Sequence, residues 1–380
     1  MEDPFDASPV PDFDTSIRTR CGYPIIEVIK AFKSVLEQGG AAAAGKSLHY
    51  SADLICSGCI ELWKKFLFEF AFDHIGVASP RIFVFLDRRF QELDILYARL
   101  TSEAFYSAFE AQKKIAECVL IVRSCPRKPP LKMPRVPPET HSNEWVRQSI
   151  GPLEITMPTP LARTYRSGND LIIVRRIGHE FIKACEQGAT EKAFFWIKWL
   201  FEEESFLKKE TRGSLSSLER GPSEWPSKSR NHIGFFFCDL LLEIYKEYQA
   251  KGLIRMNEEF IGILDLYRKV SKLSGKRRLD CLCLCIQLLC EVPKWKVPAA
   301  PSLVSDPVQL ERASGHAEQF FREVLVYAPI GSGSDIVKEA KKAMKPSQEK
   351  KKMTTKEKNA QKLEDNFAAC DAVLQKMMFS

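Results

Sequence analysis

The chain has 380 residues, of which 45% are hydrophobic and 28% charged, and its formal net charge is +7. At roughly 150 residues per domain, this length predicts two or three domains. The composition excludes a fully disordered chain and a collagen-like repeat. No apolar run approaches the roughly 18 residues of a membrane-spanning helix, and the acidic, proline-bearing residues 1–14 do not resemble a signal peptide.

The positive charge is concentrated near the C-terminus. Residues 338–362 contain ten lysines and three glutamates, so the rest of the chain is neutral overall. This pattern predicts a balanced globular body with a cationic tail that attracts phosphate groups, and it leaves DNA, RNA and an acidic protein open as the partner of the tail. The candidate nucleic-acid-binding residues are Lys338, Lys341, Lys342, Lys345, Lys350, Lys351, Lys352, Lys356, Lys358 and Lys362.

The twelve cysteines make up only about 3% of the chain, well below the share in a disulfide scaffold. Several occupy apolar helical positions, which favours buried, reduced thiols in an intracellular protein over a disulfide scaffold. Cys56 and Cys59 form a lone C-x-x-C pair, whereas a structural zinc site needs four ligands. Cys281, Cys283 and Cys285 are spaced by two and cannot all face one metal on a helix. We therefore expect no metal and no cofactor.

Helical periodicity dominates the first part of the chain. After a flexible leader at residues 1–20, residues 21–125 predict a helical domain, because apolar residues recur at the i, i+3, i+4 and i+7 positions. The expected helices cover about 25–38, 47–56, 60–73, 81–97 and 102–124. Only residues 82–86 resemble a buried strand.

A proline-rich stretch follows at residues 126–168. Residues 126–160 hold nine of the 22 prolines. Proline lacks an amide donor and restricts the residue before it. We therefore expect an extended linker.

Residues 169–330 predict a second helical domain. Helices are expected at about 171–187, 190–208, 232–250, 256–273, 278–291 and 317–326, with a polar insertion at 210–230. The lysine-rich tail at 331–380 is expected to be disordered apart from a short helix near 367–378. Residues 29–39 and 182–188 are faintly similar, which is consistent with two tandem units.

One segment matches the G-x-x-x-x-G-K-[ST] pattern of a phosphate-binding loop, with Gly40, Gly45, Lys46 and Ser47 at its fixed positions. Such a loop must emerge from a buried strand. The residues before Gly40 have helical periodicity instead. We therefore interpret 40–47 as a flexible turn between two helices and keep a P-loop NTPase only as the less favoured alternative.

No other pattern points to catalysis. The six histidines are scattered, and none stands at a recognisable spacing from a serine, cysteine or acid. We expect no catalytic residues and a non-enzymatic protein.

Residues 54–80 resemble a known family. They end in His74-Ile75-Gly76-Val77-Ala78-Ser79-Pro80, which is similar to a phrase in the helical C-terminal domain of the replication-associated recombination protein A / Werner-helicase-interacting ATPases. That domain is related to the clamp-loader collar. Residues 111–128 resemble a later helix of the same domain, and residues 191–196 resemble the start of its helix pair a second time. The tandem arrangement is similar to uncharacterised proteins of large nucleocytoplasmic DNA viruses.

The resemblance implies an all-α fold of two tandem collar-like bundles that oligomerise or dock partners. The family's ATPase module has no counterpart in the sequence, so ATP hydrolysis is not implied. The expected function is a viral scaffold in DNA replication or repair that binds replication proteins, itself or virion components, but no membrane. A virion structural or assembly protein is the alternative. The expected location is intracellular, with the host nucleus, the viral factory and the virion left open.

Overall fold

The computed structural model describes residues 18–150, 156–210, 213–254, 258–269, 275–291 and 307–327. Within these ranges the chain is all-α, as predicted: it contains no strand, and extended backbone pairs only in the isolated bridges Arg18–Pro24 and Asp170–Ser216. None of the helices described is long and apolar enough to cross a membrane. Residues 1–17 of the predicted leader and the whole predicted tail, including its helix near 367–378, lie outside these ranges.

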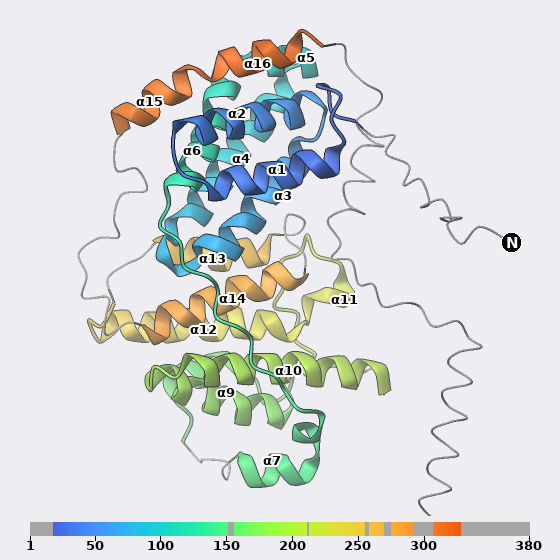
Figure 1. The fold of residues 1–380 in the computed structure, drawn as a ribbon. Coiled ribbons are helices and arrows are strands. Elements are labelled where there is room, and N and C mark those ends of the chain that lie inside the picture. The colour runs from blue at the N-terminus through green and yellow to red at the C-terminus, as the bar shows by residue number, and fades with distance from the viewer. Residues whose placement is uncertain are drawn as a thin grey trace, which may run out of the picture. The chain divides into compact units, whose positions relative to one another are not determined.

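The first group of helices packs together (Figure 1), and aromatic side chains fill its core. Its members are α1 (Ile25–Glu37), α2 (Ala41–Cys56), α3 (Ile60–Phe70), the π-helical turn η1 (Ala71–Ile75), the 3-10 turn η2 (Gly76–Ala78), α4 (Arg81–Arg99), α5 (Ser102–Ser107) and α6 (Phe109–Ser124). In the core, Phe90 meets Trp63 and Phe68 with ring centroids 5.6 and 5.1 Å apart. Burial of such large rings is a main source of stability in a helical fold.

The second group packs around α14. It comprises α8 (Thr159–Thr164), α9 (Ile172–Glu186), α10 (Thr190–Glu210), α11 (Ser227–Arg230), α12 (Ile233–Ala250), α13 (Glu258–Arg268) and α14 (Gly275–Cys290). Helices α9, α10, α12 and α13 all contact α14. α14 also contacts η2, and α13 contacts α4, so the two groups touch. All the described residues fall in one compact unit, Met1–Ile336, and the division into two collar-like domains stays a prediction.

The proline-rich stretch is not a wholly extended linker, which corrects the prediction. It contains η3 (Pro138–His141) and α7 (Asn143–Ser149), and α8 also begins within it. Proline is compatible with a first helical turn, because amides there lack intrahelical partners, and Pro138 and Pro160 stand at such positions. The stretch is held to α10, since Lys198 donates to the Pro134 carbonyl at 2.9 Å and the Trp199 indole to Thr140 at 3.2 Å.

Two helices late in the chain return to the first group. α15 (Pro307–Gly315) packs on α6, and α16 (Ala317–Leu325) packs on α2, α5 and α6. α16 was expected from the sequence, whereas α15 was not. The predicted second domain included residues 307–327, yet these helices contact the helices of residues 21–125.

Other local predictions need correction. Residues 82–86 are helical, because the apolar pattern continues one turn later through Phe90 and Leu93 on the buried face of α4. The predicted helix at 102–124 is broken at Ala108, and the one at 60–73 ends at Phe70 before the π-helical turn. The helix predicted at 278–291 begins earlier than expected, since α14 starts at Gly275.

Candidate functional site at the α1, α2 and α16 cavity

The corner between α1 and α2 is closed by two arginines of the α6 region. Arg123 donates to the carbonyls of Val35 and Gly40, and Arg127 donates to the carbonyl of Leu36. The last carbonyls of a helix lack intrahelical partners and carry partial negative charge. The two guanidinium groups therefore cap α1. Gly40 has φ +87°, the left-handed conformation that lets the chain turn into α2.

The structure does not assemble the G-x-x-x-x-G-K-[ST] residues into a phosphate-binding loop. Gly40 caps α2, while Gly45, Lys46 and Ser47 lie inside that helix. Helix α1 precedes them, where a phosphate-binding loop needs a strand. Ser47 is fully buried and its hydroxyl donates to the Ala44 carbonyl at 2.7 Å, whereas Lys46 is exposed. The predicted flexible turn at 40–47 is also wrong, because alanine favours helix and α2 begins at Ala41.

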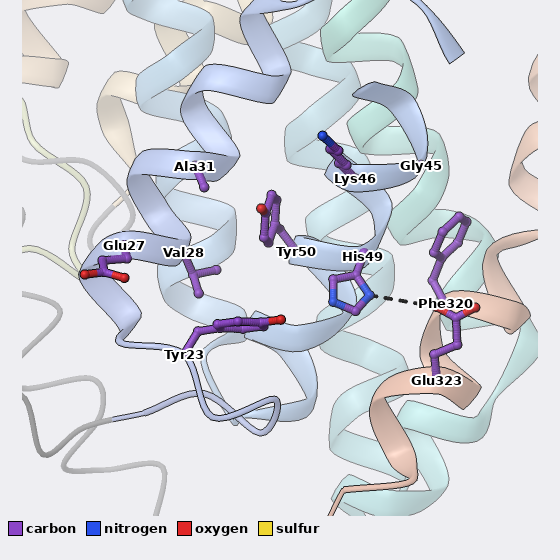
Figure 2. A pocket seen from close by; sticks show the side chains of 10 residues that line it. All are labelled: Tyr23, Glu27, Val28, Ala31, Gly45, Lys46, His49, Tyr50, Phe320 and Glu323. Atoms are coloured by element: carbon purple, nitrogen blue, oxygen red, sulfur yellow. Dashed lines mark ion pairs between the residues drawn. The ribbon is translucent and has the colours of Figure 1, made fainter. Parts of the chain in front are cut away.

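Lys46 faces a cavity of about 440 Å³ between α1, α2 and α16 (Figure 2). Apolar and aromatic side chains make up much of its wall. The lining residues are Tyr23, Glu27, Val28, Ala31, Gly45, Lys46, His49, Tyr50, Phe320 and Glu323. Tyr23 is 50% exposed, which leaves a large ring in solvent beside the cavity. Such a combination is typical of a surface that binds another macromolecule.

Helix α16 forms one wall of the cavity, and this position of the helix was not predicted from the sequence. Ala317, Phe321 and Val324 are buried, and Phe320 on the adjoining face lines the cavity. A β-carbon on Gly45 would lie 3.6 Å from the Phe320 ring, so α2 and α16 are in close contact at this point. His49 of α2 and Glu323 of α16 form an ion pair at 4.0 Å.

The cavity carries one cation and one anion that have no ion pair with another described residue. Lys46 is the cation and Glu27 the anion, and both side chains are exposed. Exposed charges of this kind cost little to keep in water and are available to a partner of opposite charge. Sequence reasoning had singled out Lys46 for another role and had missed Glu27, Tyr23 and the α16 residues.

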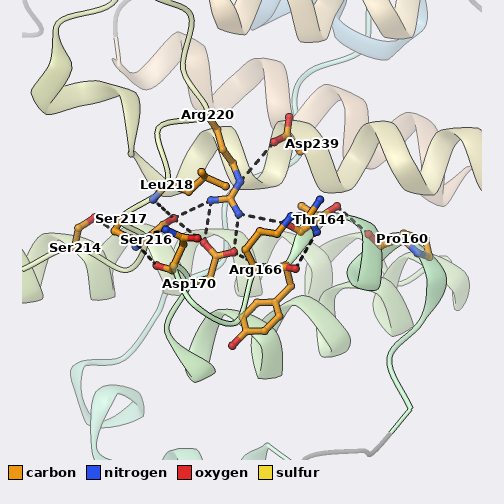
Figure 3. A network of polar contacts seen from close by, with 12 residues as sticks. Pro160, Thr164, Arg166, Asp170, Ser214, Ser216, Ser217, Leu218, Arg220 and Asp239 are labelled. Atoms are coloured by element: carbon orange, nitrogen blue, oxygen red, sulfur yellow. Dashed lines mark hydrogen bonds and ion pairs between the residues drawn. The ribbon is translucent and has the colours of Figure 1, made fainter.

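A second polar cluster serves the fold (Figure 3). The Asp170 carboxylate, which is fully buried, accepts hydrogen bonds from both terminal nitrogens of Arg220 at 2.9 and 2.6 Å, and Asp170 also accepts from the Ser216 hydroxyl at 2.6 Å and the Arg166 amide at 2.8 Å. These bonds tie the residues around Ser216 to the corner before α9. Because both carboxylate oxygens are engaged within the fold, the cluster has a structural role.

Most of the cysteines that the sequence raised as metal candidates are core residues. Burial raises the pKa of Cys56 and of Cys59 to about 12, which keeps these thiols protonated. Cys281 and Cys285 are fully buried, and the Cys283 thiol lies 3.5 Å from the Met133 sulfur. The described ranges contain no group of three or more histidine, cysteine or acidic side chains arranged to hold a metal ion.

The ten candidate lysines of the tail lie outside the described residues, so their role stays a prediction. Comparison with known proteins finds no match for this chain to a protein-family profile, a curated protein or a solved structure.

Proposed function

We propose that this chain is a non-enzymatic helical scaffold that pairs with a second copy of itself through the α1, α2 and α16 cavity and holds nucleic acid with its lysine-rich tail. The observation that carries the proposal is the juxtaposition of Glu27, Lys46 and the exposed Tyr23 ring at one cavity. Aromatic anchors flanked by charge are characteristic of protein interfaces.

A second copy suits this surface because its charges are self-complementary. In a two-fold symmetric dimer, residue i of one subunit contacts residue j of the other, and j contacts i in return. Glu27 of one copy would face Lys46 of the other, so the pair would form twice. The Tyr23 rings would fill the apolar parts of the two cavities.

The wider role that we propose is in DNA replication or repair, where the dimer would hold replication proteins close to nucleic acid. Two arguments support it. The sequence resembles the collar domain of replication-associated ATPases, and residues 338–362 carry a local charge of +7. Lysines that neutralise phosphates release counterions, which gives affinity without sequence specificity.

Light scattering coupled to size-exclusion chromatography tests the pairing. The full chain is expected to show a dimer whose fraction rises with concentration. Glu27→Lys and Lys46→Glu should each shift it towards monomer, because each places like charges opposite one another. Lys30→Glu changes an exposed charge of α1 that does not line the cavity, and should leave the dimer intact. A strict monomer, or equal behaviour of all variants, would refute the pairing.

Retention on a DNA duplex tests the tail. The full chain should bind at low salt, with log affinity falling against log salt at a slope of up to about −9 if all ten lysines contact phosphate. Deletion of residues 335–380 should abolish this binding. Retention that survives the deletion would show that the tail is not the contact.

A further inference from the structure

A second cavity, of about 320 Å³, lies where the two helical groups meet, and we call it the junction cavity. Its walls come from the η1 and η2 turns of the first group, from α10 and α14 of the second, and from the non-helical stretch 128–133. That stretch follows α6 and runs past α14 and α10 towards α7 (Figure 1). Ligand sites of proteins occur preferentially at such junctions and start at about 300 Å³.

The non-helical wall of the junction cavity is fixed at several points. The Lys128 amide donates to the His74 carbonyl at 3.0 Å, and the Cys283 thiol lies 3.5 Å from the Met133 sulfur. Between these contacts, two consecutive prolines at 129 and 130 restrict the backbone further. The wall is therefore already ordered, so a ligand loses little affinity to the cost of ordering it.

The junction cavity offers an apolar wall that extends from the core to the surface. Two of its side chains, Phe72 and Phe194, are almost completely buried, whereas Leu131 is 39% exposed. An apolar group placed along this wall is favoured because it leaves water. The apolar side chains that line the cavity are Phe72, Val77, Leu131, Met133, Phe194 and Leu284.

The charges around the junction cavity leave one cation without a carboxylate. The charged lining residues are Lys128, Lys132, Arg277, Asp73 and Asp280. Both carboxylates contact the Arg277 guanidinium, and Lys128 pairs with Glu291 at 3.4 Å. Lys132 is exposed and has no ion pair with another described residue. The cavity is therefore suited to a ligand with one negative charge.

Gln287 of α14 adds a buried donor to the junction cavity. Its side chain is 5% exposed, and its amide nitrogen donates to a Glu291 carboxylate oxygen at 3.2 Å. An amide nitrogen carries two protons, so Gln287 has a second one to donate to a ligand. Amide and ammonium donors both suit a carboxylate, whose oxygens only accept.

We propose that the junction cavity binds an amphipathic carboxylate of the fatty-acid class. The chain of the ligand lies along the apolar wall, and its carboxylate pairs with Lys132. The unpaired lysine determines the sign of the ligand's charge, and the apolar side chains determine its body. Such a ligand touches both helical groups at once. It therefore stabilises the state in which they are joined and raises the thermal midpoint of the protein.

Isothermal titration calorimetry of the full chain with decanoate, below its micellar concentration, tests the class of ligand. We expect one site per chain. Acetate has the charge without the apolar body, and decyltrimethylammonium has the same chain with the opposite charge. Each should bind at least about tenfold more weakly than decanoate, because each lacks one half of the recognition.

Two pairs of variants test the location. Lys132→Glu should weaken decanoate binding about fivefold or more, because it replaces an attraction near the surface by a repulsion. Lys46→Glu makes the same change at the α1, α2 and α16 cavity and should leave the affinity unchanged. Val77→Trp fills the junction cavity and should reduce binding. Val308→Trp adds the same ring at a residue of α15 that is 60% exposed and should have no effect.

The Cys283 thiol gives a second, local readout. It lines the junction cavity and is partly exposed. Burial raises its pKa above the usual value, so iodoacetamide should modify it slowly. Decanoate should slow the reaction further, as followed by peptide mass spectrometry. Cys21, which is also partly exposed but lies outside this cavity, should react at an unchanged rate.

Three results would overturn the proposal. The first is the absence of both a heat of binding and any protection of Cys283 at millimolar decanoate. The second is equal affinity for decanoate and decyltrimethylammonium. The third is a loss of affinity with Lys46→Glu that Lys132→Glu does not cause. Circular dichroism shows whether each variant is folded. If Val77→Trp unfolds the chain, the exposed Lys132 and the Cys283 rate in the wild type still decide the matter.

Discussion

Arg277 of α14 forms a two-point ion pair with Asp73 of η1, with Nη1–Oδ1 and Nη2–Oδ2 distances of 2.7 Å each. Asp280 adds a third contact to the same guanidinium at 3.0 Å. Burial by itself would lower the pKa of Arg277, but hydrogen bonds to the two carboxylates raise it above its usual value. The pair joins the two helical groups at the π-helical turn that follows α3, and its planar geometry is one that lysine cannot reproduce.

Arg277→Met should destabilise the protein by about 1–3 kcal/mol. The Arg277 side chain is only 10% exposed, but Asp73 is 40% exposed, so the cost falls below that of breaking a fully buried pair. Urea unfolding of the variant measures it. Arg322→Met breaks an exposed i,i+4 pair in α16 and should cost less than about 0.5 kcal/mol. Equal effects of the two substitutions would show that the Asp73 pair has no special role.

The two glycines of the G-x-x-x-x-G-K-[ST] segment should respond in opposite directions to alanine. Gly45 lies in the interior of α2 with room for a methyl group beside Phe320, so Gly45→Ala should stabilise by about 0.5–1 kcal/mol. Gly40 has φ +87°, and Gly40→Ala should destabilise by about 1 kcal/mol or more. Thermal unfolding compares the two. A loss of stability with Gly45→Ala would contradict this packing of α2 against α16.

Removing Asp170 should be among the most damaging single changes. Both partners of the Asp170–Arg220 pair are almost entirely buried, at 0% and 5% exposure. Asp170→Ala would leave the buried Arg220 charge with only the Asp239 carboxylate, at 3.6 Å, at a cost of up to about 5 kcal/mol. Glu219→Ala removes a carboxylate that is 52% exposed and paired with Arg230, and serves as the control. Chemical denaturation that gives similar values for both would refute the structural role of the cluster.

Acidification should weaken the start of α12 through His232. The His232 Nδ1 accepts a hydrogen bond from the Gly234 amide at 3.0 Å, which requires a ring nitrogen without a proton. Burial lowers the pKa of His232 below its usual value of 6.5. The unfolded chain therefore binds the proton more readily, so stability is full above about pH 6.5 and falls as pH drops towards the folded-state value.

His232→Asn separates this effect from other titrations. An asparagine oxygen also accepts at a helix N-cap but does not titrate in this range. The difference in unfolding free energy between the variant and the wild type should therefore shift in favour of the variant from pH 7.5 to pH 5.5. A difference independent of pH would mean that His232 does not titrate in the way we describe.

Helical periodicity predicted most of the fold, because it depends only on local spacing. The buried faces of α1, α9 and α12 can be predicted from apolar residues that are three and four positions apart. The strand-like pattern of residues 82–86 gave a wrong prediction, because five apolar residues are too few to distinguish a strand from a helix. The extended linker expected from the prolines of residues 126–160 was wrong in part, because proline is compatible with a first helical turn.

The candidate site could be predicted only in part. The pattern around Lys46 drew attention to α2, but the cavity also needs α16, whose Phe320 and Glu323 are far away in the sequence. The pair of Arg277 with Asp73 is likewise long-range. Such pairs cannot be predicted from a spacing within the sequence, because they depend on how distant helices pack.

A mixing experiment tests the central claim, that two copies pair through Glu27 and Lys46, most directly. Glu27→Lys and Lys46→Glu chains, each labelled with a different fluorophore, are measured alone and together by analytical ultracentrifugation. The account predicts monomers for each alone. In the mixture, both facing positions of one chain carry lysine and both of the other carry glutamate, so opposite charges meet at each contact and a heterodimer forms. Failure of the mixture to dimerise, with the wild type dimeric under the same conditions, would contradict it.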